Sequence, residues 1–145
     1  MEELMAWIAR LALVLFILFL VWVVAWMRIF SKAGFPGWFA IIPIVNMFIL
    51  AQIAGKPGWW GLLWCGLFVL SYESSHPIIQ IAGGIGASFL HVIFTLELAK
   101  NFGKGGGFTV GLLLLPWIFH CILGFGSAQY LGPNGQQQEI QPEEV

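Results

Sequence analysis

The sequence predicts an all-α fold, a polytopic integral membrane helical bundle with four or five transmembrane segments. Hydrophobic residues make up 59% of the 145 residues, charged residues only 9%, and the mean hydropathy is +0.88. A soluble domain of this size carries about 25% charged residues. The apolar residues also gather in five runs separated by glycine, proline and charged residues. So few charges cannot cover a surface that faces water, and we expect most of the chain to lie in lipid.

Each apolar run is predicted to form one helical segment. In order, the runs are Leu4 to Met27, Trp38 to Ala54, Gly58 to about Ser71, Pro77 to Ala99 and Gly107 to about Phe125. At about 1.5 Å per residue, the first and fourth can cross a hydrocarbon core of about 30 Å, and the second and fifth nearly do. The third falls short unless it extends through Ser75. It could instead be half of a broken, re-entrant unit whose other half begins at Pro77.

The two ends of the chain differ in character. The first run follows Glu2 and Glu3 and is longer than the roughly 7 to 15 residues of a signal-peptide core, so it is interpreted as an uncleaved transmembrane helix. The last residues are rich in Gln, Glu, Pro and Gly. The sequence therefore predicts a transmembrane domain over residues 1–131 and a disordered acidic tail over 132–145.

Basic residues give a partial guide to orientation, because Lys and Arg concentrate in cytoplasmic loops. Outside the first apolar run they are Arg28, Lys32, Lys56, Lys100 and Lys104. Five crossings divide them 3:2 between the two sides, and four crossings divide them 4:1 with Lys56 alone. Segment length favours five crossings and charge favours four, so both remain open. The net charge of −1 gives no basic stripe for nucleic acid.

A short motif recurs before three of the runs. The stretch from Gly34 to Phe39 (GFPGWF) is repeated from Gly55 to Trp60 (GKPGWW) and more loosely from Gly103 to Phe108 (GKGGGF). Glycine tolerates a positive φ and proline fixes φ, so each copy predicts a tight turn. The nearby aromatic rings and lysines are typical of membrane-interface anchors. The candidate anchors are Trp38, Lys56, Trp59, Trp60, Lys100 and Lys104. A pocket for a lipid headgroup is the alternative interpretation.

Polar residues inside the apolar runs are candidates for function, because they are costly in hydrocarbon unless they face a partner or a cavity. They are Asn46, Gln52, Gln80, His91, Glu97 and His120. Glu97 lies three residues before Lys100, which favours an intrahelical ion pair over a proton relay. Asn46 follows Pro43 and is expected to satisfy the backbone there. His91 and His120 could in principle hold a haem, but their expected depths differ, and hydrogen bonding between helices is preferred.

Small residues at four-residue spacing let helix backbones approach closely in a membrane. The candidate packing residues are Ala82, Gly83, Gly84, Gly86, Ala87 and Ser88 in the fourth run, and Gly107 and Gly111 in the fifth. Cys65 and Cys121 have no partner at a metal-ligand spacing, so neither a metal site nor a disulfide framework is expected.

Four stretches in order resemble a family of small bacterial multi-pass membrane proteins of unknown function. They are IFSKAGFPGWFAIIPIVNMFIL (Ile29 to Leu50), IAGKPGWW (Ile53 to Trp60), ELAKNFGKGGGF (Glu97 to Phe108) and LPWIFHCILGFGSAQYLG (Leu115 to Gly132). The resemblance covers roughly Trp26 to Gly132. The chain departs from the family's pattern at the polar interval from Tyr72 to Pro77, at His120 and at Ser127. A role specific to His120 would therefore not be a family role.

Members of that family are often labelled signal peptidase I, and this chain does not meet the needs of that chemistry. The reaction needs a serine activated by a lysine on a rigid, water-accessible domain. Ser31 and Lys32 are adjacent, so their side chains point apart, and no other serine has a lysine at a suggestive spacing. We expect no peptidase activity.

These observations favour a non-enzymatic protein of the bacterial inner membrane. The expected role is an accessory or scaffold subunit that packs with itself or with a larger membrane protein through the Ala82 to Ser88 face, surrounded by membrane lipid. The alternative is a small transporter, channel or lipid-handling protein whose cavity is lined by Asn46, Gln80, His91 and Glu97. No cofactor, metal or nucleic-acid partner is expected.

Overall fold

The computed structural model describes residues 1–133, and every regular element in that range is a helix. The long helices are α1 (Glu2–Lys32) and α4 (Pro77–Asn101). The shorter elements are the 3-10 helix η1 (Gly37–Ile41), α2 (Pro43–Ile53), α3 (Trp59–Glu73), α5 (Gly106–Leu114) and α6 (Pro116–Phe125). The prediction of an all-α fold is confirmed. The expected tail falls almost wholly beyond the described range.

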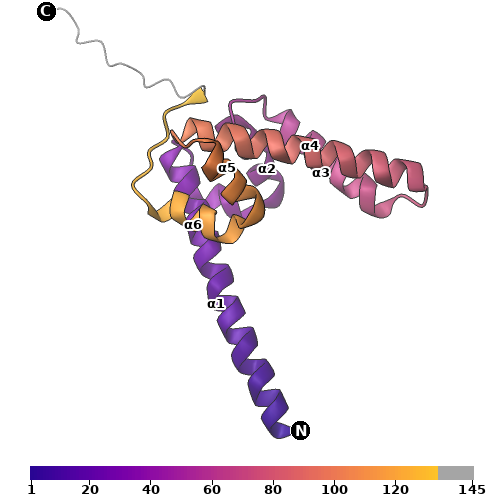
Figure 1. Ribbon diagram of the computed structural model, residues 1–145, viewed down its shortest axis with the longest axis vertical. Helices are drawn as coiled ribbons and strands as arrows, with labels where there is room; N and C mark the ends of the chain where they lie inside the picture. Colours follow the sequence, from indigo (N-terminus) through magenta and orange to yellow (C-terminus); the bar gives the residue numbers. More distant parts are fainter. Residues whose placement is uncertain (134–145) are drawn as a thin grey trace, which may run out of the picture.

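The core lies where the C-terminal part of α1 meets the other helices. Its central residues are Ile29, Phe30, Ile53, Leu98 and Leu123, which come from α1, α2, α4 and α6. Helix α1 packs against α6 and η1, while α3 packs against α4 and α2. Two arms leave this core in different directions: the N-terminal part of α1, and the α3–α4 hairpin, which projects to the side of the α1 axis (Figure 1).

Two helices in the described range are long and apolar enough to cross a membrane, α1 and α4, judged by length and composition. In the most apolar stretch of α1 only 6% of residues are buried within the chain, against 28% in α4. The prediction of four or five spanning helices finds no support in the lengths of the other helices. Helix α3 has 15 residues, and α2 has 11.

The second and fifth apolar runs are each broken by a proline. Ile42 and Leu115 have extended or irregular backbone, and Pro43 and Pro116 each begin a new helix. The residue before a proline is disfavoured in the helical region, and proline is well suited to the first turn of a helix. The fifth run, expected as one helix, is therefore two short helices, α5 and α6, folded against each other.

The recurring glycine motif ends three helices in the same way. Gly34, Gly55 and Gly103 all have positive φ, at 84°, 73° and 66°. The residue after each glycine donates its backbone N–H to a carbonyl five positions earlier: Phe35 to Phe30, Lys56 to Ala51 and Lys104 to Ala99. This is the Schellman pattern, which satisfies carbonyls at a helix C-terminus and favours glycine. The repeat is thus a helix stop that reverses the chain at the ends of α1, α2 and α4.

Candidate functional site

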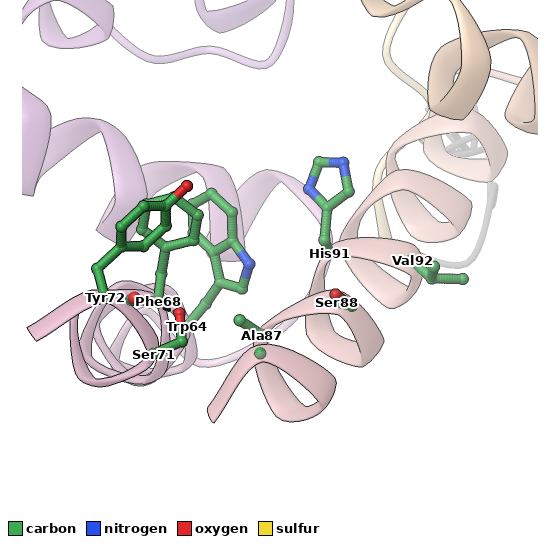
Figure 2. A pocket seen from close by; sticks show the side chains of 9 residues that line it. Trp64, Phe68, Ser71, Tyr72, Ala87, Ser88, His91 and Val92 are labelled. Atoms are coloured by element: carbon green, nitrogen blue, oxygen red, sulfur yellow. Dashed lines mark hydrogen bonds between the residues drawn. The ribbon is translucent and has the colours of Figure 1, made fainter. Parts of the chain in front are cut away.

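A pocket lies between α3 and α4. It has a volume of about 510 Å³ and is open on one side. Figure 2 shows the aromatic side chains of α3 gathered along one wall and His91 and Val92 of α4 along the other. The lining residues are Trp64, Phe68, Ser71, Tyr72, Gly84, Ala87, Ser88, His91 and Val92. An aromatic lining with a few hydroxyl groups and one imidazole suits an amphipathic ligand.

The His91 ring stacks on Trp64, with ring centroids 5.8 Å apart and planes inclined by 21°. Gly84 borders the same pocket, and a Cβ built there would meet only the Cβ of Ser71, at 4.0 Å. The pocket therefore has room for a larger side chain at position 84. Of the four polar residues expected to line a cavity together, the structure places His91 in this pocket and the other three elsewhere.

Two of the polar residues contact backbone carbonyls beside the proline breaks. Asn46 donates from Nδ2 to the carbonyl oxygen of Ala40 at 2.7 Å, which links α2 to η1 across the first break. His120 lies with Nδ1 2.6 Å from the carbonyl oxygen of Pro116, where the second break ends. A carbonyl oxygen can only accept, so Nδ1 carries the proton in this contact. The Asn46 amide thus satisfies a carbonyl that the first break leaves without its helical donor, whereas the His120 ring makes a second contact to a carbonyl inside the first turn of α6.

Gln80 and Glu97 lie near the two ends of the α3–α4 hairpin. Gln80 donates from Nε2 to the carbonyl oxygen of Ser74 at 2.7 Å, which fastens the turn between the helices. Glu97 Oε1 lies 3.6 Å from Lys100 Nζ and 3.7 Å from Lys56 Nζ. The first of these contacts is the one expected from the sequence spacing. The second joins α4 to the loop before α3, which sequence reasoning did not foresee.

A cluster of aromatic rings between α1 and α6 was also not foreseen. Trp22 stacks on Trp117 with centroids 4.9 Å apart, and His120 lies 4.6 Å from Trp26 by the same measure. The indole N–H groups of Trp22 and Trp26 are buried without a hydrogen-bond partner. The tryptophans were visible in the sequence, but nothing in their spacing indicates that α6 would lie beside α1. His91 therefore stacks on Trp64, and the His120 ring lies tilted against a different tryptophan, Trp26.

The candidate packing residues divide between internal contacts and open surface. Gly83 and Ala87 are buried, and a Cβ at Gly83 would lie 3.0 Å from the Leu67 carbonyl oxygen of α3. A Cβ at Gly86 would lie 3.1 Å from the Leu67 side chain. Ala82 and Ser88 are exposed. In the fifth run, Gly111 lies against the Phe119 ring, whereas Gly107 has open space around it.

The candidate interface anchors lie near the turns that follow the helix stops. Trp38 and Trp59 are exposed and Trp60 is half-buried. Lys104 Nζ lies 5.8 Å from the Phe108 ring centroid, within the range of a cation–π contact. Among residues 1–133, no group of three or more His, Cys, Asp or Glu side chains is placed to hold a metal ion.

Comparisons with known proteins give one match. The model of a family of unknown function, DUF5684, matches residues 38–133. No curated protein and no solved structure matches the chain. The matched range contains the pocket, both proline breaks and the last two helix stops. Most of α1 lies before it.

Proposed function

The chain belongs to DUF5684, a family of unknown function, and from its own residues we propose that it is a non-enzymatic integral membrane protein that acts as an accessory or scaffold subunit. It packs with itself or with a larger membrane protein. The proposed location is the bacterial inner membrane. The sequence predicts four or five crossings, and this number stays a prediction. In the described residues two helices, α1 and α4, are long and apolar enough to be candidate spans.

Membrane insertion is supported by the arm formed by α1. A helix of 31 residues is about 46 Å long, which exceeds a hydrocarbon core of about 30 Å. Every residue from Met1 to Val21 is exposed, on all faces of the helix. Exposed apolar residues all round a helix are stable in hydrocarbon and unstable in water. Lipid is the environment that this arm requires.

The scaffold role is supported by a stripe of exposed apolar residues on the outer face of α4. Ile78, Ile81, Ile85 and Phe89 recur at three- and four-residue spacing, and all are exposed, by 81, 62, 66 and 66%. The opposite face of α4, with Gly83 and Ala87, packs against α3. Helix α4 therefore has one face engaged within the chain and one apolar face free for a second membrane helix.

Native mass spectrometry in mild detergent tests this proposal. We expect the full chain to copurify with itself or with a larger membrane protein. Changing Ile85→Trp on the stripe should reduce that complex, because the larger ring disrupts close helix contact. Leu13→Trp on the α1 arm is the matched control and should leave the complex unchanged. A monomer without partner for the unmodified chain would exclude the scaffold role.

A second candidate, a lipid-handling protein, is favoured by the α3–α4 pocket. Its apolar walls suit an acyl chain, and His91, Ser71 and Ser88 offer hydrogen-bonding groups for a polar head. Here the same mass spectra should show a retained lipid. Gly84→Leu should release it, because the side chain fills open space in the pocket. Retention of the lipid by that variant would place the lipid outside the pocket.

A further inference from the structure

Two hairpins are each broken by a proline: η1 with α2, and α5 with α6. Their contacts indicate how the chain enters the membrane. In a chain that crosses five times, the second and fifth apolar runs each pass from one side to the other. The contacts at the ends of these two runs indicate a different path, because they hold both ends of each hairpin at the same end of the core.

The first hairpin folds back along α1. A Cβ built at Gly37 would lie 2.8 Å from the Met27 carbonyl oxygen and 2.9 Å from the Ser31 hydroxyl, so η1 runs back beside the last turns of α1. Helix α2 begins at Pro43, after the extended Ile42, and packs against η1. Helix α2 then returns and ends at Ile53, whose carbonyl oxygen accepts from Asn101 at the end of α4.

The second hairpin repeats this course. It leaves the end of α4 at Asn101, and its two helices meet where Gly111 lies against Phe119. Its far end returns to α1, where Lys32 Nζ donates to the carbonyl oxygens of Leu123 and Gly126, both at 2.7 Å.

Helix α6 and the segment after it confirm this direction. Trp117 lies beside Trp22 and His120 beside Trp26, so α6 runs in the same direction as α1. Beyond α6, the backbone N–H of Leu131 donates to the Asn101 carbonyl oxygen at 2.7 Å. The chain after α6 therefore lies at the end of α4, where the hairpin began.

Basic residues gather at this same end. Of the six basic residues, all except Arg10 lie on the segments that meet here. Arg28 lies 5.6 Å from the Phe125 ring centroid, Lys32 holds the end of α6, and Lys56 and Lys100 share Glu97. Lys104 follows the Gly103 turn. Glu2 and Glu3 lie at the other end of α1 (Figure 1).

We infer that both hairpins are re-entrant, entering and leaving the membrane at one face, and that this face is the cytoplasmic one. The inference rests on the proposed membrane insertion. Of the basic residues outside the first apolar run, it places five on this face and none on the other, where five crossings give 3:2 and four give 4:1. Irregular backbone at membrane depth is tolerated where protein covers it and satisfies it, which is the part that Asn46 plays at the first break.

Single-cysteine labelling of the full chain in membrane vesicles tests the inference. The background chain carries Cys65→Ala and Cys121→Ala, which removes both native cysteines. Single cysteines are then placed in the four segments at the basic end and at the N-terminus, as Pro36→Cys, Pro57→Cys, Gly105→Cys, Ser127→Cys and Glu3→Cys. All but the last lie at exposed loop positions. A membrane-impermeant maleimide is applied to inverted and to right-side-out vesicles.

We expect the first four positions to react in inverted vesicles only, and Glu3→Cys in right-side-out vesicles only. Labelling of Ser127→Cys and Gly105→Cys from opposite sides would show that the fifth run crosses. Labelling of Pro36→Cys and Pro57→Cys from opposite sides would show the same for the second run. Either result overturns the inference while leaving membrane insertion intact. Extraction of the chain by alkaline carbonate would instead refute the proposed membrane insertion itself, and the inference with it.

Discussion

Asn101 donates from Nδ2 to the carbonyl oxygen of Ile53 at 2.8 Å, across 48 positions of sequence. Both residues are fully buried. Ile53 is the last residue of α2, so its carbonyl has no partner within its own helix. The Tyr130 hydroxyl donates to the same oxygen at 3.0 Å. The end of α2 is therefore held by side chains from α4 and from the segment after α6.

We expect the loss of both donors together to destabilise the fold by more than the sum of the two single losses. Asn101→Leu should lower the free energy of unfolding by about 1–3 kcal/mol, and Tyr130→Phe by about 0.5–1.5 kcal/mol. Together they leave the Ile53 carbonyl without a side-chain donor, so the double variant should lose more than the sum. Chemical unfolding in detergent measures all three. Strict additivity would mean that the two donors do not share this acceptor in solution.

The Tyr130 contact also predicts a pH dependence. Burial raises the pKa of the Tyr130 phenol above its usual value of about 10. As the pH rises past 10, the unfolded chain loses this proton first, so the folded state binds more protons and stability falls. Thermal unfolding should show a steeper decline above pH 10 for the unmodified chain than for Tyr130→Phe. Lysines titrate in both proteins and cancel in the difference, so parallel curves would contradict the prediction.

The sequence predicts the helix stops well, because their cause is local. Glycine at Gly34, Gly55 and Gly103 allows the positive φ that each stop uses, and the repeat is visible by eye. The apolar runs likewise predict the helical class. These features depend on residues within one or two turns of each other.

The breaks and the pairing of helices could not be predicted in the same way. Proline is tolerated inside membrane helices when neighbouring groups satisfy the freed backbone, so Pro43 and Pro116 do not by themselves indicate a reversal. The reversal depends on distant contacts such as those between Lys32 and the end of α6. For the same reason, the Trp22 and Trp117 contact had no signal in the sequence, and His91 could not be assigned to a pocket.

The ion pairs of Glu97 should contribute little to stability. The Glu97 side chain is 20% exposed, and its partners Lys56 and Lys100 are 31% and 59% exposed, so water screens both pairs. Exposed pairs contribute about 0–1 kcal/mol. Glu97→Gln should therefore change the midpoint of thermal unfolding only slightly, and less at high salt. A large loss that persists at high salt would instead indicate a buried role for this carboxylate.

Gly124 should be far less tolerant of a side chain than other glycines, because α1 and α6 meet there. A Cβ at this position would lie 2.5 Å from the Ala25 carbonyl oxygen and 2.8 Å from its Cα, and Ala25 is itself fully buried. These are backbone atoms, so α6 would have to move away from α1. We expect Gly124→Ala to lower the free energy of unfolding by about 1–3 kcal/mol, as overpacking of a dense interior does.

Gly107→Ala is the matched control, since nothing lies within 4 Å of a Cβ there and the position is in the first turn of α5. Alanine is a better helix former than glycine by about 1 kcal/mol, so this variant should be neutral or more stable. If both variants have the same stability, α1 and α6 are not in contact in the membrane. Because Lys32 holds α6 through the same pair of helices, that result would also remove the main support for a re-entrant second hairpin.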